Sequence, residues 1–130
     1  MSRAIYIVCV SGTRETLQMA GMVASVAAAS GDEVAVFFSM NALQYFVKGH
    51  SEEAPTEGAF GELMANNDGV PPFKQLFRFA ADLGDAKLLP CSMALDLMEL
   101  TAEDLEPELG APTGLTVFLS DAAKGQLLTF

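Results

Sequence analysis

Short apolar runs alternate along this chain with longer segments whose apolar residues recur every three or four positions. Residues 5–10 and 34–38 are continuous β-branched and aromatic runs, which is typical of strands buried on both faces of a sheet. Between them, residues 13–31 have helical spacing, with Thr13 as the expected N-cap and Gly31 as the expected stop. A helix between two buried strands predicts a parallel sheet with right-handed crossovers.

The same alternation continues to the end of the chain. Thr101 and Asp104 have the spacing of a capping box at the start of a short helix. Further helices are expected at residues 40–48, 73–83 and 91–100, and further strands at residues 87–89, 115–119 and 126–130, the last at a sheet edge. The pattern predicts an α/β protein, a three-layer α/β/α sandwich around a mainly parallel sheet of about five strands.

Residues 50–72 depart from this pattern. Glutamate, glycine, proline and asparagine accumulate there, and only Phe60, Leu63 and Met64 offer a short apolar anchor. Because so long a stretch without periodicity is unusual inside a compact domain, we expect a mobile loop or lid. The length of 130 residues otherwise fits a single domain, residues 1–130.

Composition restricts the expected partners. The net charge of -10 repels phosphate backbones and anionic lipid surfaces, so no nucleic acid is expected and a peripheral membrane contact is not favoured. Yet 51% of the residues are hydrophobic and the mean hydropathy is +0.32. Excess apolar surface on a small protein is most often covered by other subunits, so a homo-oligomer is expected.

The two cysteines, Cys9 and Cys91, are too few for a disulfide framework. No secretory signal is visible, and no apolar stretch has the length needed to cross a bilayer. Free thiols and a cytoplasmic location are therefore expected.

Common catalytic and ligand-binding motifs are missing from the sequence. Gly12 belongs to neither a G-x-G-x-x-G nor a Walker motif, and His50, the single histidine, has no cysteine at metal-ligand spacing. There is no C-x-x-C pair and no G-x-S-x-G elbow. Neither a metal nor a cofactor is therefore expected, and an enzyme that uses a flavin or a nucleotide has only fold analogy in its favour.

Cys91 is the strongest candidate for chemistry. It follows Pro90 at the end of an apolar run and precedes a helical segment, so we expect it at the carboxyl edge of the sheet and at a helix N-terminus. The positive end of a helix favours the thiolate, which is the nucleophilic form of cysteine. The structural alternative is a small buried hydrophobic residue, which is the role expected of Cys9 inside the first strand.

Other residues follow the strands at the same edge, where ligands of open parallel sheets bind. The expected supporting residues around Cys91 are Ser11, Gly12, Ser39, Asn41, Ser92 and Met93. Hydroxyl and N–H groups there would stabilise a persulfide anion, which favours a cysteine that accepts and passes on a sulfane sulfur. Lys74 and Arg78 share a helical face and would add positive charge, although a structural role is favoured for both.

These elements together resemble the DsrE/DsrF-like family of sulfur-relay proteins, in its larger branch with one functional cysteine. The resemblance spans nearly the whole chain and is carried by Ser11-Gly12, Gly31, Glu33-Val34, Val36-Phe37-Phe38-Ser39, Leu88, Cys91-Ser92-Met93, Asp96-Leu97-Met98, Leu100-Thr101 and Glu103-Asp104-Leu105. It implies a flavodoxin-like sandwich, homo-oligomers (trimers or hexamers), and sulfur donor and acceptor proteins as partners. It also implies that Cys91 carries a persulfide sulfur.

The sequence departs from that branch at several positions. Members usually have a serine and a methionine where this chain has Ala94 and Leu95, and glycines where it has Ala42 and Glu99. Two functions therefore stay open. The first is a sulfur carrier or sulfurtransferase that uses Cys91, and the alternative is a non-catalytic oligomeric assembly or small-ligand-binding module with an inert cysteine.

Overall fold

The structure, a computed structural model, describes residues 3–50 and 53–130. Its sheet has four parallel strands in the order β3-β2-β1-β4. The strands are β1 (Ala4–Cys9), β2 (Glu33–Phe38), β3 (Lys87–Pro90) and β4 (Gln126–Thr129). The predicted α/β class and parallel sheet are confirmed, with four strands where about five were expected.

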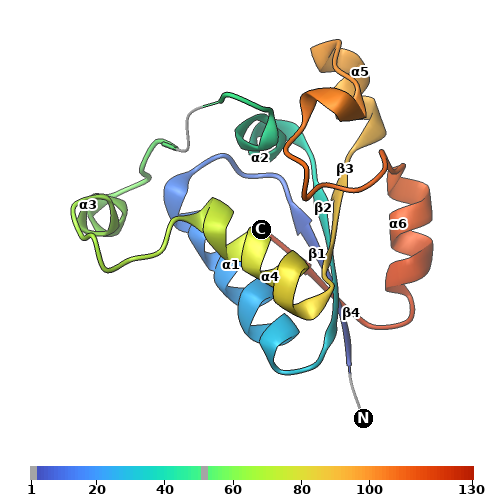
Figure 1. The fold of residues 1–130 in the computed structure, drawn as a ribbon, viewed down its shortest axis with the longest axis horizontal. Helices are drawn as coiled ribbons and strands as arrows, with labels where there is room; N and C mark the ends of the chain where they lie inside the picture. The colour runs from blue at the N-terminus through green and yellow to red at the C-terminus, as the bar shows by residue number, and fades with distance from the viewer. Residues whose placement is uncertain (1–2, 51–52) are drawn as a thin grey trace.

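Helices cover both faces of this sheet, which makes the three layers (Figure 1). Helices α1 (Arg14–Ala29) and α4 (Phe73–Gly84) lie on one face, and α6 (Leu115–Ala122) lies on the other. Small residues let α1 and α4 approach closely, since a Cβ on Gly21 would lie 3.1 Å from the Cβ of Leu76. Four alanines of α1 are buried as well and pack within this chain: Ala20, Ala24, Ala27 and Ala28.

The strand predicted at residues 115–119 is wrong, because this segment is the start of helix α6. A short run of β-branched and aromatic residues fits a buried strand and a helix equally well. In the structure only Phe118 and Ala122 of α6 are buried, four positions apart, which is the spacing of one helical face. Helix α6 connects the β3 side of the sheet to β4.

Shorter elements lie beyond the carboxyl ends of the strands. They are α2 (Met40–Leu43), the 3-10 helix η1 (Gln44–Phe46), α5 (Ser92–Met98) and the 3-10 helix η2 (Ala102–Asp104). The capping box of Thr101 and Asp104 is formed, as predicted. The expected lid contains a short helix, α3 (Ala59–Ala65), around the predicted apolar anchor, and its residues 51–52 lie outside the described part of the chain.

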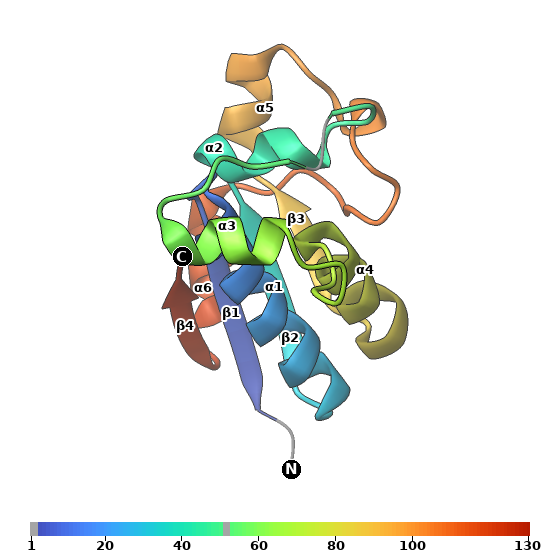
Figure 2. The ribbon, with the colours of Figure 1, turned by 90° about the vertical axis from the view of Figure 1, so that its left-hand side faces the viewer.

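The chain covers the outer edge of β3 with its own backbone. The N–H of Gly110 donates to the carbonyl of Leu88 (2.7 Å), and the N–H of Thr113 donates to the carbonyl of Pro90 (2.9 Å). Residues 110–113 thus run beside β3 in the place of a further strand. The opposite edge of the sheet is β4 (Figure 2).

An aromatic cluster fixes the end of β2 that leads to the candidate site. The ring of Phe38 lies 4.2 Å from the ring of Phe46 and 4.9 Å from that of Phe77, and all three side chains are fully buried.

Within the described residues, no helix is long and apolar enough to cross a membrane.

Candidate functional site

Cys91 lies at the junction between β3 and α5, as the sequence predicts. Pro90 is the last residue of the strand, and Cys91 is the N-cap of the helix, with an extended backbone. Its N–H donates to the carbonyl of Phe38 on β2 (2.9 Å), and its carbonyl accepts from the N–H of Leu95 (3.1 Å). Cys91 is thus held to the sheet on one side and to the helix on the other.

The Cys91 side chain is covered in this conformation, with 4% of its surface exposed. Ser92 beside it is half-buried, and Met93 is 51% exposed. The N–H of Ser92 donates to the carbonyl of Thr113 (3.0 Å), so the backbone donors of both Cys91 and Ser92 are engaged within the fold. A ligand bound to the Cys91 sulfur would therefore have to accept hydrogen bonds from other groups, unless this segment moves.

The sequence did not identify Thr113 as a neighbour of Cys91. Thr113 forms an isolated parallel bridge with Cys91, although 22 positions separate the two in the printed sequence. Its hydroxyl donates to the carbonyl of Ala111 (3.0 Å), which stabilises the turn that leads into this bridge. No local motif marks this contact, because it depends on how residues 110–113 fold back onto β3.

Ser39 is the predicted supporting residue on the strand next to Cys91. Phe38 pairs with Pro90 in the β2–β3 register, so Ser39 and Cys91 are the residues that follow that pair. The Ser39 side chain is buried, and its N–H donates to the carbonyl of Cys9 (3.0 Å). Its position therefore agrees with the sequence prediction.

Ser11, Gly12 and Asn41 form a separate group at the same edge. A Cβ on Gly12 would lie 2.8 Å from the Cβ of Asn41, so only glycine allows these two loops to approach so closely. Ser11 follows β1, two strands away from β3, which places it about 10 Å along the edge from Cys91. Its hydroxyl lies 3.2 Å from the hydroxyl of Thr13. The predicted supporting loops share one edge but do not all surround the sulfur.

Cys9 is a core residue, as predicted. Its side chain is fully buried in β1, and this burial raises the pKa of the Cys9 thiol to about 12. A thiol with such a pKa is protonated at neutral pH and is neither a nucleophile nor a carrier of an anionic sulfur. Both cysteines are free thiols, which leaves Cys91 as the candidate.

The two cations of α4 are paired with carboxylates. The Nζ atom of Lys74 lies 3.8 Å from Oε1 of Glu106, and the Nε atom of Arg78 lies 3.5 Å from Oε2 of Glu108. The side chains of Lys74 and Glu108 are almost fully buried. These pairs fix residues 106–108 to α4, so the structural role favoured from the sequence is confirmed.

A second feature that the sequence did not reveal joins residues 57–58 to the start of α1. The carboxylate of Glu15 accepts the N–H groups of Glu57 (2.9 Å) and Gly58 (2.8 Å), which lie directly before α3. In return, the carboxylate of Glu57 accepts the hydroxyls of Thr13 and Thr16. The Glu15 carboxylate thus accepts backbone N–H groups at the start of α3, whereas the Glu57 carboxylate binds side-chain hydroxyls at the start of α1. Figure 2 shows α3 in front of α1, with α5 farther away at the top of the view.

These hydrogen bonds give the contact between α1 and the start of α3 a defined pH response. The N–H of Glu57 and other backbone donors hold the pKa of the Glu15 carboxyl below its ordinary value. A carboxyl whose pKa is lowered in the folded state stabilises that state above its ordinary pKa, and this contribution is lost as the pH falls through the lowered value. This contact is therefore complete at neutral pH and weakens only in acid.

Glu15→Gln is expected to loosen this contact at neutral pH, because the amide supplies one neutral acceptor in place of a charged pair of oxygens. Hydrogen exchange at the amides of Glu57 and Gly58 should be faster than in the wild type. In the wild type, exchange at these amides should accelerate as the pH falls, after correction for the intrinsic exchange rate. In Glu15→Gln this acceleration should be absent. Asp68→Asn, an exposed change in the same segment, is the control. Equal exchange in Glu15→Gln and Asp68→Asn would contradict the assigned contact.

Within residues 3–50 and 53–130, no group of three or more histidine, cysteine, aspartate or glutamate side chains is arranged to hold a metal ion. The side chains named at the candidate edge carry hydroxyls, one amide, one thioether and one thiol.

Comparisons with known proteins agree with this fold. A sequence model of the DsrE/DsrF/DrsH-like family matches residues 54–130, which is more than half of the chain and includes Cys91. The crystal structure of the ychN protein from E. coli is similar, with a TM-score of 0.70 at 14% identity over 100% of both chains. The protein of unknown function MTH1491 from Methanobacterium thermoautotrophicum has a TM-score of 0.58 at 10% identity, also over 100% of both chains. A comparison with curated sequences gave no match.

Proposed function

Because the chain belongs to the DsrE/DsrF/DrsH-like family, we propose that it acts in sulfur relay as a carrier that holds a sulfane sulfur on Cys91. The observation that supports this role is the position of Cys91 at the carboxyl end of β3, directly before α5. Cys9 is fully buried and burial raises its pKa, which leaves Cys91 as the candidate carrier thiol. Ser39 follows the neighbouring strand β2 at the level of Cys91. The exposed Met93 lies two positions after Cys91 in the chain.

The chemical step is an exchange of one sulfur atom between two thiols. The thiolate of Cys91 attacks the outer sulfur of a donor persulfide, R–S–SH, and the donor S–S bond breaks as a new S–S bond forms on Cys91. The donor leaves as R–S⁻, and the proton stays with the transferred sulfur, so the products are R–S⁻ and the Cys91 persulfide. No net oxidation or reduction occurs, and the same step in reverse passes the sulfur to an acceptor thiol.

The covered sulfur must be uncovered for this reaction. Helix α5 has seven residues, and its outer side chains are largely exposed, with Leu97 at 76% and Met93 at 51%. A helix this short is held by few bonds, and it extends beyond the sheet (Figure 1). Displacement of α5 and Met93 is therefore the movement that we propose exposes the Cys91 sulfur to a donor.

The proposal is tested by loading and discharge. The purified protein is incubated with a low-molecular-weight persulfide, freed of excess donor and mixed with an acceptor thiol. The expected result is a gain in intact mass of one sulfur atom per chain, followed by loss of that mass and appearance of the acceptor persulfide. A protein that gains no sulfur, or that keeps the sulfur in the presence of the acceptor, would contradict a carrier role.

One observation favours the alternative function. The 4% exposure of Cys91 suits an inert core thiol in a protein that has kept the fold as an assembly or small-ligand-binding module. That role predicts equally slow alkylation of Cys91 and Cys9 in the folded protein. Alkylation of Cys91 well before Cys9 supports the carrier.

A further inference from the structure

Residues 106–113, which we call the strap, connect η2 to α6 and pass the end of β3 (Figure 1). The last residue of the strap, Thr113, donates its N–H to the carbonyl of Pro90 (2.9 Å) and accepts the N–H of Ser92 at its own carbonyl (3.0 Å). Ser92 is the first residue of α5. Displacement of α5 as a whole must break this bond, so the strap restrains the movement assigned above to the uncovering of Cys91.

The strap is stiff, although it contains no helix and no strand of the sheet. Pro107 and Pro112 stand near its two ends, and the ring of proline fixes the backbone angle φ. Next to Pro112, the hydroxyl of Thr113 donates to the carbonyl of Ala111 (3.0 Å). A displacement of the strap at Glu108 is therefore transmitted along it to Thr113.

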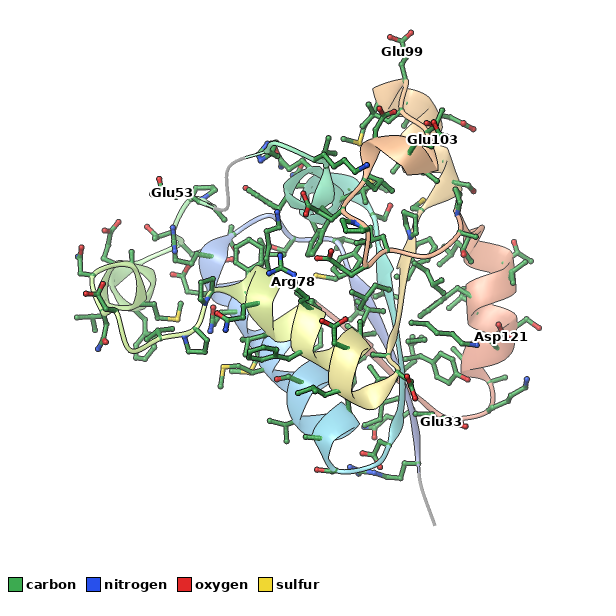
Figure 3. All side chains as sticks on the ribbon, in the orientation of Figure 1. Glu33, Glu53, Arg78, Glu99, Glu103 and Asp121 are labelled. Carbon is green, nitrogen blue, oxygen red and sulfur yellow. The ribbon has the colours of Figure 1, made fainter. Side chains whose placement is uncertain are left out.

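Glu108 attaches the strap to α4 by a contact that is incompletely satisfied. Its side chain is 6% exposed, and its Oε2 atom lies 3.5 Å from the Nε atom of Arg78, which is labelled in Figure 3. This distance is longer than that of an ordinary N–H···O hydrogen bond. Within the described residues, the buried Oε2 atom accepts no hydrogen bond. A buried carboxylate in this state depends on its counter-charge, which here is the guanidinium of Arg78.

The start of the strap is held by separate contacts. Leu105, directly before it, is buried and forms an antiparallel bridge with Val47. The N–H of Glu106 donates to the carbonyl of Phe46 (2.8 Å). Release of Glu108 would therefore free the part of the strap that contacts β3 and α5, while its start stays in place.

We propose that the ion pair of Arg78 and Glu108 is a latch that keeps the strap closed and so controls access to the Cys91 thiol. Without the guanidinium, the Glu108 carboxylate is buried without a counter-charge, and it reaches water when the strap leaves α4. The strap then carries Thr113 away from Ser92, and α5 is free to move. The inference rests on the proposed function for the use of this opening, whereas the opening itself is measured without sulfur transfer.

The test is the rate at which iodoacetamide alkylates Cys91 in the folded full chain, measured by mass spectrometry of the peptide that contains Cys91. Arg78→Met removes the guanidinium and keeps most of the apolar stem. Cys91 of this variant should be alkylated about tenfold faster than in the wild type. The effect stays below that of a fully buried pair, because the Arg78 side chain is 42% exposed. Circular dichroism checks that the variant is folded.

A double variant, Arg78→Met with Glu108→Met, separates charge from packing. It removes the buried carboxylate together with its partner, so the strap should close again and the alkylation rate should return to within about twofold of the wild type. Lys124→Met is the matched control, since it removes one positive charge from an exposed position outside the strap. It should keep the rate of the wild type.

Hydrogen exchange of the wild type tests the same movement without a substitution. One opening of the strap exposes the amides of both Ser92 and Thr113, so their exchange rates should agree within about twofold after correction for intrinsic exchange. Clearly different rates would overturn the proposal, even if Arg78→Met does not fold.

Three results of the alkylation experiment would also overturn the latch. They are an unchanged rate in Arg78→Met, a double variant that is as fast as Arg78→Met, and a Lys124→Met protein that is equally fast. Sulfur uptake on Cys91 with an unchanged rate in Arg78→Met would contradict the latch and keep the carrier. Faster alkylation of Arg78→Met without sulfur uptake by the wild type would keep the latch and contradict the carrier.

Discussion

Phe118→Ala is expected to lower the free energy of unfolding by about 3–5 kcal/mol. Phe118 is 1% exposed, and its ring lies 5.8 Å from the ring of Tyr6 and 5.1 Å from that of Phe37. In the described residues, α6 is the helix that covers this face of the sheet, and Phe118 is its one large buried side chain. Truncation therefore removes the main anchor of the α6 layer. The loss is large compared with the total free energy of unfolding of native proteins, which is about 5–15 kcal/mol.

Urea denaturation followed by circular dichroism measures this effect. The matched control is Val117→Ala, one position earlier on the exposed side of α6, which should change the stability by no more than about 0.5 kcal/mol. Phe118→Leu should lie between the two, and it keeps the comparison measurable if the alanine variant does not fold. Equal stabilities for Phe118→Ala and Val117→Ala would mean that Phe118 does not anchor α6.

Cys91→Ser is expected to abolish sulfur uptake while it leaves the fold intact. The hydroxyl of serine does not form the S–S bond that the carrier step requires. Serine is also a favoured N-cap residue, which is the position that Cys91 occupies before α5, so the helix should keep its start. The variant thus separates the chemistry of the thiol from its place in the structure, and a thermal unfolding curve close to the wild type would establish that separation.

Cys9→Ala is the matched control for the same assay. Cys9 is fully buried in β1, and the high pKa of its thiol leaves it protonated at neutral pH. The alanine variant should therefore take up one sulfur atom per chain, as the wild type does. If sulfur uptake survived in Cys91→Ser but was lost in Cys9→Ala, Cys9 and not Cys91 would carry the sulfur.

The strands could be predicted where the sequence combines burial on both faces with clear ends. Strands β1 and β2 are runs of β-branched and aromatic residues between polar loops, and Pro90 marks the end of β3. Helix α4 was also clear, because Phe73 and Phe77 repeat with helical spacing. The helix extends one residue beyond the predicted end, to Gly84, and its C-cap residue Asp85 has a left-handed backbone.

Helix α6 could not be distinguished from a strand by its sequence. Its first five residues, from Leu115 to Leu119, are almost all apolar, and a run of that length suits both structures. Tertiary packing decides the outcome, because the connection from the β3 side of the sheet to β4 must cross one face, and a helix anchored by Phe118 crosses it. Local propensity carries no information about that connection.

The candidate site was predictable in its location but not in its details. The order of strands, Pro90 and helical residues places Cys91 at the carboxyl edge of the sheet. Its burial and its contact with Thr113 depend on how distant segments pack. The same holds for Glu15 and Glu57, which bond across 42 positions of the sequence without any local motif.

The most direct test of the central claim is the location of the sulfur in the wild-type protein. The folded chain is loaded with a persulfide donor, its remaining thiols and persulfides are alkylated after denaturation, and the peptides that contain Cys91 and Cys9 are compared by mass spectrometry. The account predicts an additional sulfur on the Cys91 peptide and none on the Cys9 peptide. Sulfur on Cys9, or on neither cysteine, would contradict it.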